Sequence, residues 1–163
     1  MTRYGAIMLA ASALLLLTAC GGGSKTTPDD DYFNGVAKAL SGQQKETEKI
    51  FGDGSALLEC NRAATVSLAA AKAACGSYMG QLDALGKSLG KLRETVARAA
   101  PPDRARDWQI RFLTFLDNSV FATVSAVDAF RKGDAAGIVK FGSRLESIPA
   151  EGDTLIAELG RLR

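Results

Sequence analysis

A run of apolar residues at helical spacing constrains the fold of this chain more than any other feature. At intervals of three, four, three, four and three residues, the run contains Leu82, Leu85, Leu89, Leu92, Val96 and Ala99. This spacing places all six on one face of a helix and is typical of a seam that packs against another helix. Pro101 and Pro102 follow, and proline removes a backbone donor and leaves helical geometry. We therefore predict a helix between residues 77 and 100.

Three further segments have apolar residues at the same helical spacing. The first runs from residue 31 to about 51 and ends at a Gly-Asp-Gly turn. The second runs over about 103–132, and its broad apolar face indicates a central position. Gly133 is expected to end that helix and Asp134 to cap the next one. The last helix contains Pro149, which should kink it or split it into two pieces.

No segment shows the alternation and the β-branched enrichment of a strand. The chain is therefore predicted to be all-α. Four amphipathic helices joined by short breaks are most simply arranged as an antiparallel four-helix bundle, in up-down-up-down order in preference to a crossover. We assign this helical bundle domain to residues 31–163.

The N-terminus has a separate organisation. Arg3 precedes an apolar run over residues 4–17, which is shorter than the roughly 20 residues that a helix needs to span a bilayer. A signal for export fits this order, and a plain secretory signal would leave Cys20 as a thiol. The four residues 17–20, Leu-Thr-Ala-Cys, resemble the lipobox of bacterial lipoproteins, which is Leu, a small residue, Ala or Gly, then Cys.

The resemblance to bacterial lipoproteins implies a processing route and an address. Residues 1–19 would be a signal peptide, and Cys20 would become the acylated first residue, carrying palmitate-type chains. Residues 20–30 would form the lipidated cysteine and a disordered tether, because they are rich in Gly, Ser, Thr and Pro. Gly21 lacks the aspartate signal for inner-membrane retention. We therefore expect the outer membrane in a Gram-negative cell and the outer leaflet of the plasma membrane in a Gram-positive cell.

With Cys20 assigned to lipid, Cys60 and Cys75 form an even pair in an oxidising compartment. One straight helix would hold them roughly 22 Å apart, far beyond the reach of a disulfide. Either the chain turns back between them or they do not pair. We predict a disulfide, with the turn near residues 60–62.

The composition excludes several kinds of site. The chain has no histidine, the commonest general base and metal ligand. Its 20 basic and 18 acidic residues form no basic block, so no nucleic-acid partner is expected. We also expect no cofactor, no metal and no catalytic residue. Asp117 and Asp128 are the one carboxylate pair worth testing, and the simpler interpretation pairs each with Arg or Lys.

Two functions remain open from the sequence. The favoured one is a non-enzymatic envelope lipoprotein, anchored to the membrane at Cys20, whose bundle binds an envelope protein or supports a complex. The alternative is a carrier or sensor that holds a small apolar ligand between helices. Its candidate groove residues are Gly86, Gly90, Trp108, Phe112 and Phe115. The simpler interpretation of the glycines is close approach of a neighbouring helix. The region 99–159 also resembles uncharacterised helical envelope lipoproteins in a generic way that transfers no functional residue.

Overall fold

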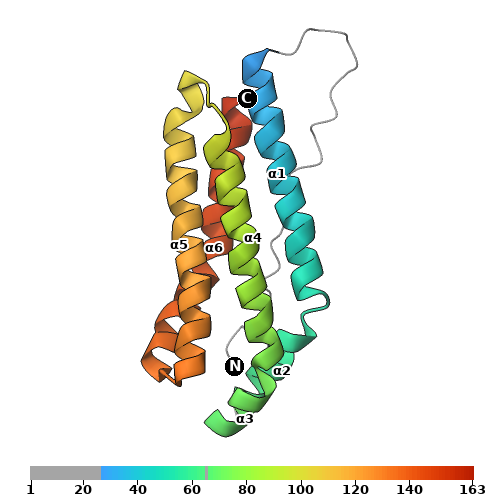
Figure 1. Ribbon diagram of the computed structural model, residues 1–163, viewed down its shortest axis with the longest axis vertical. Helices are drawn as coiled ribbons and strands as arrows, with labels where there is room; N and C mark the ends of the chain where they lie inside the picture. The colour runs from blue at the N-terminus through green and yellow to red at the C-terminus, as the bar shows by residue number, and fades with distance from the viewer. Residues whose placement is uncertain (1–26, 65) are drawn as a thin grey trace.

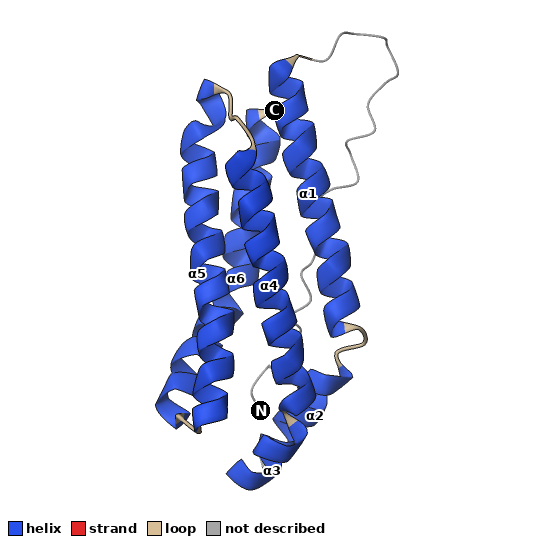
Figure 2. Cartoon of the chain, viewed as in Figure 1, coloured by secondary structure: helices blue, strands red, loops and turns tan. Residues whose placement is uncertain are grey.

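The computed structural model describes residues 27–163 except residue 65. Within that part of the chain every regular element is helical, as Figure 2 shows. The elements are α1 (Pro28–Phe51), α2 (Ser55–Ala64), α3 (Leu68–Ala74), α4 (Gly76–Arg98), the short 3-10 turn η1 (Asp103–Ala105), α5 (Arg106–Lys132) and α6 (Ala135–Leu162). The all-α prediction is confirmed for these residues. The expected signal peptide, Cys20 and the tether up to residue 26 lie outside them.

Helix α1 begins three residues before the predicted start at Asp31. Thr27 is its N-cap, because the Asp30 amide donates to Thr27 Oγ1 over 3.2 Å and the Thr27 amide donates to Asp30 Oδ2 over 3.0 Å. Pro28 occupies the first turn, where its missing donor costs nothing. Residues 28–30, which were expected to belong to the tether, are therefore the first turn of α1.

The four long helices lie side by side, and Figure 1 shows the blue α1 and the yellow α5 descending while α4 and α6 ascend. Helix α4 packs against both α1 and α5, and α5 packs against both α4 and α6. The sequence predicted a central position for α5. In the structure α5 packs on two helices, and its buried face contains Trp108, Phe112, Leu116 and Val127. Among the described residues, 103–132 is the one helical stretch long and apolar enough to cross a membrane by length and composition, and α4 and α6 pack against it.

Two short helices, α2 and α3, separate α1 from α4 and form a hairpin at one end of the molecule (Figure 1). A disulfide joins Cys60 to Cys75 with 4.3 Å between the two Cα atoms, so the predicted bond is confirmed. The turn predicted at residues 60–62 is wrong, because α2 continues to Ala64. The chain reverses before Ser67, whose hydroxyl accepts from the Ala70 amide over 3.1 Å and caps α3.

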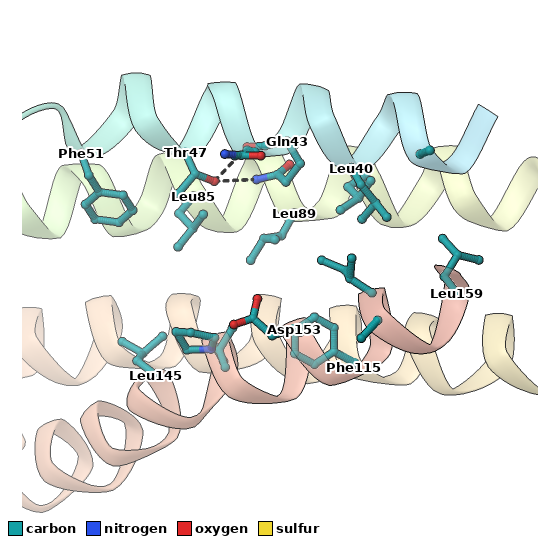
Figure 3. Close-up of a pocket in the computed structure, with 18 of the residues that line it drawn as sticks. Leu40, Gln43, Thr47, Phe51, Leu85, Leu89, Phe115, Leu145, Asp153 and Leu159 are labelled. Atoms are coloured by element: carbon teal, nitrogen blue, oxygen red, sulfur yellow. Dashed lines mark hydrogen bonds between the residues drawn. The ribbon is translucent and has the colours of Figure 1, made fainter. Parts of the chain in front are cut away.

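Helix α6 remains one continuous helix through Pro149. Proline has no amide hydrogen to donate to the carbonyl four residues earlier, that of Leu145. Figure 3 shows the helix axis changing direction between Leu145 and Asp153. Arg144 and Glu151 bracket this region, with Arg144 Nη2 donating to Glu151 Oε2 over 3.0 Å. Of the two possibilities left open by the sequence, the structure therefore has a bend and no split.

Candidate functional site

An apolar groove of about 550 Å³ lies between α1, α4 and α6 (Figure 3). It exists because α1 packs along α4, and α6 packs along α5, so that α1 and α6 face each other across the leucine seam of α4. The seam residues at its floor are Leu82, Leu85, Leu89 and Leu92. Phe115 of α5 also contributes to the lining. The seam that the sequence predicted as a helix contact is thus partly a groove surface.

The α1 wall changes from apolar to polar along its length. Leu40 marks the apolar part, and Gln43 and Thr47 follow one and two turns later. Ser88 Oγ of α4 donates to Gln43 Oε1 over 2.9 Å, and Gln43 Nε2 donates to Thr47 Oγ1 over 3.2 Å. Figure 3 shows Gln43 and Thr47 of this polar band beside Leu85, and both line the groove. Because these groups bond to one another, the band orients its side chains without leaving a buried polar group unpaired.

The α6 wall combines larger apolar residues, such as Ile156 and Leu159, with three small ones. Gly152 lies so close to Phe115 that a Cβ atom there would be 3.3 Å from Phe115 Cζ. A Cβ atom at Gly160 would meet nothing within 4 Å. Ala157 lies between them on the same lining surface. Small side chains on this wall leave the space that the groove occupies. Asp153 is the one acidic residue among those that line the groove, and its carboxylate projects from α6 into the groove in Figure 3.

Two arginines close one end of the groove. Arg104, in η1, pairs with Asp29 in the first turn of α1 and donates through Nε to the Leu162 carbonyl oxygen over 2.8 Å. Its guanidinium also lies 5.0 Å from the centre of the Phe33 ring. Arg163 Nη2 donates to Asn34 Oδ1 over 3.0 Å. The start of α1 and the end of α6 are therefore held together here.

Aromatic and aliphatic side chains form the opposite end. The rings of Phe51 and Tyr78 lie 6.3 Å apart between their centroids. Burial raises the pKa of the Tyr78 hydroxyl above its usual value, so this phenol stays neutral over the physiological range. Leu145 and Ile148 complete this end from the bent part of α6.

Of the five groove residues predicted from the sequence, Phe115 alone lines this groove. Trp108 is fully buried and donates through Nε1 to the Leu155 carbonyl oxygen over 2.7 Å. Phe112 stacks on it with 4.8 Å between ring centroids. Gly86 faces Thr123 of α5, whereas a Cβ atom at Gly90 would meet nothing within 4 Å, and Gly90 does not line the groove. The close-approach interpretation of the glycines therefore applies at Gly86.

The sequence reasoning missed the residues that distinguish the two walls, namely Gln43 and Thr47 on α1 and Asp153 and Gly160 on α6. One signal could have found the α6 wall. Gly152 and Gly160 are eight residues apart, a spacing that places both on one helix face. The α1 wall had no comparable signal, since glutamine and threonine are as common on solvent-facing surfaces as in sites.

The carboxylates considered for catalysis are paired with cations at helix borders. Arg93 Nε lies 2.9 Å from Asp117 Oδ1, and Lys132 Nζ lies 2.6 Å from Asp128 Oδ2. Within residues 27–64 and 66–163, no group of three or more Cys, Asp or Glu side chains is arranged to hold a metal ion. The groove is therefore the candidate functional site in the described part of the chain.

Comparison with known proteins leaves the groove to be interpreted from its own chemistry. The chain matches no protein-family model, no curated protein and no solved structure.

Proposed function

We propose that this chain is a lipid-anchored, non-enzymatic envelope protein that carries or senses a small apolar ligand in the groove between α1, α4 and α6. The observation that carries the proposal is the groove itself. Its volume of about 550 Å³ falls within the roughly 300–1,000 Å³ of small-molecule sites. Such sites combine a mostly apolar lining with a few placed polar groups, and here those groups include Gln43, Thr47, Asp153 and Arg163.

The finer architecture is part of this proposal. The four long helices form an antiparallel up-down-up-down bundle in which three interfaces, α1–α4, α4–α5 and α5–α6, are packed. The fourth interface, between α1 and α6, holds the ligand. A bundle in water gains roughly 25 cal/mol for each Å² of apolar surface that it covers. Leu82, Leu89 and Leu92 on the floor are already buried. A ligand would therefore gain by covering the apolar surface that other lining residues expose between α1 and α6.

The anchor places this bundle at a membrane. Cys20 is seven residues before Thr27, so the intervening chain spans at most roughly 25 Å. With Cys20 acylated, the start of α1 and the end of the groove closed by Arg104 would stay near the bilayer surface. Because residue 21 is glycine, the expected location stays as predicted from the sequence, namely the outer membrane or the outer leaflet of the plasma membrane. The protein-binding role that the sequence favoured remains a prediction.

The test is photolabelling of the full-length lipidated protein in nanodiscs with a diazirine-bearing fatty alcohol, followed by peptide mapping. We expect labelled peptides from α1, α4 and α6. Gly160→Phe should remove most of this labelling, because a ring there enters the groove where no atom lies within 4 Å of a Cβ position. Gly80→Phe is the matched control, since Gly80 is an exposed α4 glycine with the same free space that does not line the groove. Equal labelling in the two variants would overturn the proposed function.

A further inference from the structure

Only two of the described residues that line the groove have a charged side chain, and they lie at different positions along its length. Arg163 is at the closed end, and Asp153 is ten residues earlier on α6, about 15 Å along a helix. The remaining polar lining side chains are neutral amides and hydroxyls. The groove therefore has a positive end, an acidic middle and an apolar far end.

The guanidinium of Arg163 is available to an anion. Its Nη2 donates to a neutral acceptor, Asn34 Oδ1, over 3.0 Å. Within the described chain, no Asp or Glu carboxylate lies within ion-pair distance of Arg163. The Asp30 carboxylate is near enough for the positive charge of Arg163 to help lower its pKa, and it forms its own hydrogen bonds with Thr27. The planar fork of arginine matches a carboxylate, which it can bind through two parallel hydrogen bonds. The neighbouring Arg104 differs, since Asp29 already occupies it.

The apolar floor is long enough for one acyl chain. Leu92 and Tyr78 lie at its two ends and are fourteen residues apart, which is about 21 Å along a helix. A single chain in one leaflet covers half of a hydrocarbon core of about 30 Å, or about 15 Å. Because the floor is one row of leucines wide, it accommodates one chain lying lengthwise.

From this polarity and length, and resting on the proposed function, we propose that the ligand is a fatty acid with its carboxylate on Arg163 and its chain directed toward Phe51 and Tyr78. Asp153 supports this orientation, because its negative charge disfavours an anionic head in the middle of the groove. The methylene chain then passes along the leucines below the Asp153 rim. The closed end thus recognises the head and the leucine seam recognises the chain.

The first test compares palmitate with hexadecanol, which has the same chain and no charge, as competitors of the fatty-alcohol photolabel on the full-length protein in nanodiscs. Palmitate should compete at a concentration about fivefold lower, the scale expected of an exposed charge pair. Arg163→Gln should abolish this preference and leave competition by hexadecanol unchanged. Arg161→Gln, which removes an exposed cation outside the groove, should keep the preference, and Arg163→Lys should retain part of it.

The second test maps orientation with two palmitate analogues that carry the diazirine near the carboxylate or near the chain terminus. We expect the first to label peptides around Phe33 and Gly160, and the second to label those around Phe51 and Tyr78. Equal competition by palmitate and hexadecanol, or a reversed labelling pattern, would overturn the fatty-acid inference while the apolar-ligand proposal stands. Failure of every chain-bearing probe to label the groove would overturn both.

Discussion

Gly86 of α4 and Thr123 of α5 approach so closely that a Cβ atom on Gly86 would lie 2.7 Å from Thr123 Oγ1. Thr123 has no exposed surface, and its hydroxyl donates to the Val120 carbonyl oxygen over 2.8 Å. The threonine side chain is therefore fixed by its own helix and cannot rotate away without losing that bond. The contact between α4 and α5 depends on the missing side chain at Gly86.

Gly86→Ala should lower the free energy of unfolding by up to about 2 kcal/mol. Overpacking against Thr123 costs about 1–3 kcal/mol, and this outweighs a gain of up to about 1 kcal/mol in helix propensity. Gly80→Ala is the control and should be stabilising, since a Cβ atom there meets nothing within 4 Å. Urea unfolding followed by circular dichroism measures both, and shifts of the same sign would contradict the close approach. Thr123→Ala should relieve the penalty in a double variant.

Gln109→Met should destabilise the protein by about 1–3 kcal/mol, the cost of leaving a buried polar group unsatisfied. The Gln109 side-chain amide donates to the carbonyl oxygens of Val96 over 2.6 Å and Ala99 over 3.1 Å. The Val96 carbonyl also accepts from the Ala99 amide over 3.1 Å, so the uncompensated loss in the variant is the bond to the Ala99 carbonyl, just after the end of α4. Gln44→Met is the control, because Gln44 bonds to the exposed Glu48. Denaturant unfolding would show comparable losses for both variants if the Gln109 bonds contributed nothing.

Removal of the disulfide by Cys60→Ala with Cys75→Ala should cost about 3 kcal/mol, the value for closing a loop of about 15 residues. Hydrogen exchange should rise first in α2 and α3, because these helices form the hairpin that the bond closes. A reductant should lower the stability of the wild-type protein by a similar amount and leave the double variant unchanged. An effect of the reductant on the double variant would point to another cause.

Acidification should loosen the first turn of α1. Hydrogen bonds from the Thr27 amide and hydroxyl hold the pKa of Asp30 below its ordinary value of 3.8. Because the folded-state pKa is the lower one, the ionised carboxylate stabilises the fold above pH 3.8, and this contribution is lost as the pH falls through the folded-state pKa. Asp30→Asn should therefore differ from the wild type at neutral pH and converge with it in acid. Amide exchange at residues 28–31 provides the readout, and a difference that persists in acid would exclude this linkage.

Cys20→Ala should leave an unprocessed precursor, because the lipobox route requires the cysteine thiol as the acceptor of the lipid. Metabolic labelling with an alkyne palmitate analogue should mark the wild-type protein and miss the variant. Ser24→Ala is a suitable control, since it changes a nearby small residue outside the box. Normal maturation and membrane retention of Cys20→Ala would refute the lipoprotein assignment.

The helices and their ends were largely predictable because their signals act within a few residues. The sequence predicted a cap at Gly133, which has the left-handed φ of 71°, and an N-cap at Asp134, which accepts from the Gly137 amide over 3.0 Å. The Cys60–Cys75 pair was predicted because assigning Cys20 to lipid leaves two cysteines in an oxidising compartment. The predicted position of the hairpin turn was wrong because Asn61 and Arg62 are compatible with a helix. The chain instead turns between the end of α2 at Ala64 and Ser67, which caps α3.

The amino-acid sequence by itself determined that the described chain is helical and, to within about three residues, where its long helices begin and end, because periodicity, prolines and capping residues are local. Only the tertiary structure decided which face of each helix would be covered. The leucine seam of α4 meets α1 on one side and opens to the groove on the other. Arg104 joins Asp29 to Leu162 across segments far apart in the chain. Such contacts depend on how all four long helices pack together, and no spacing within one helix encodes them.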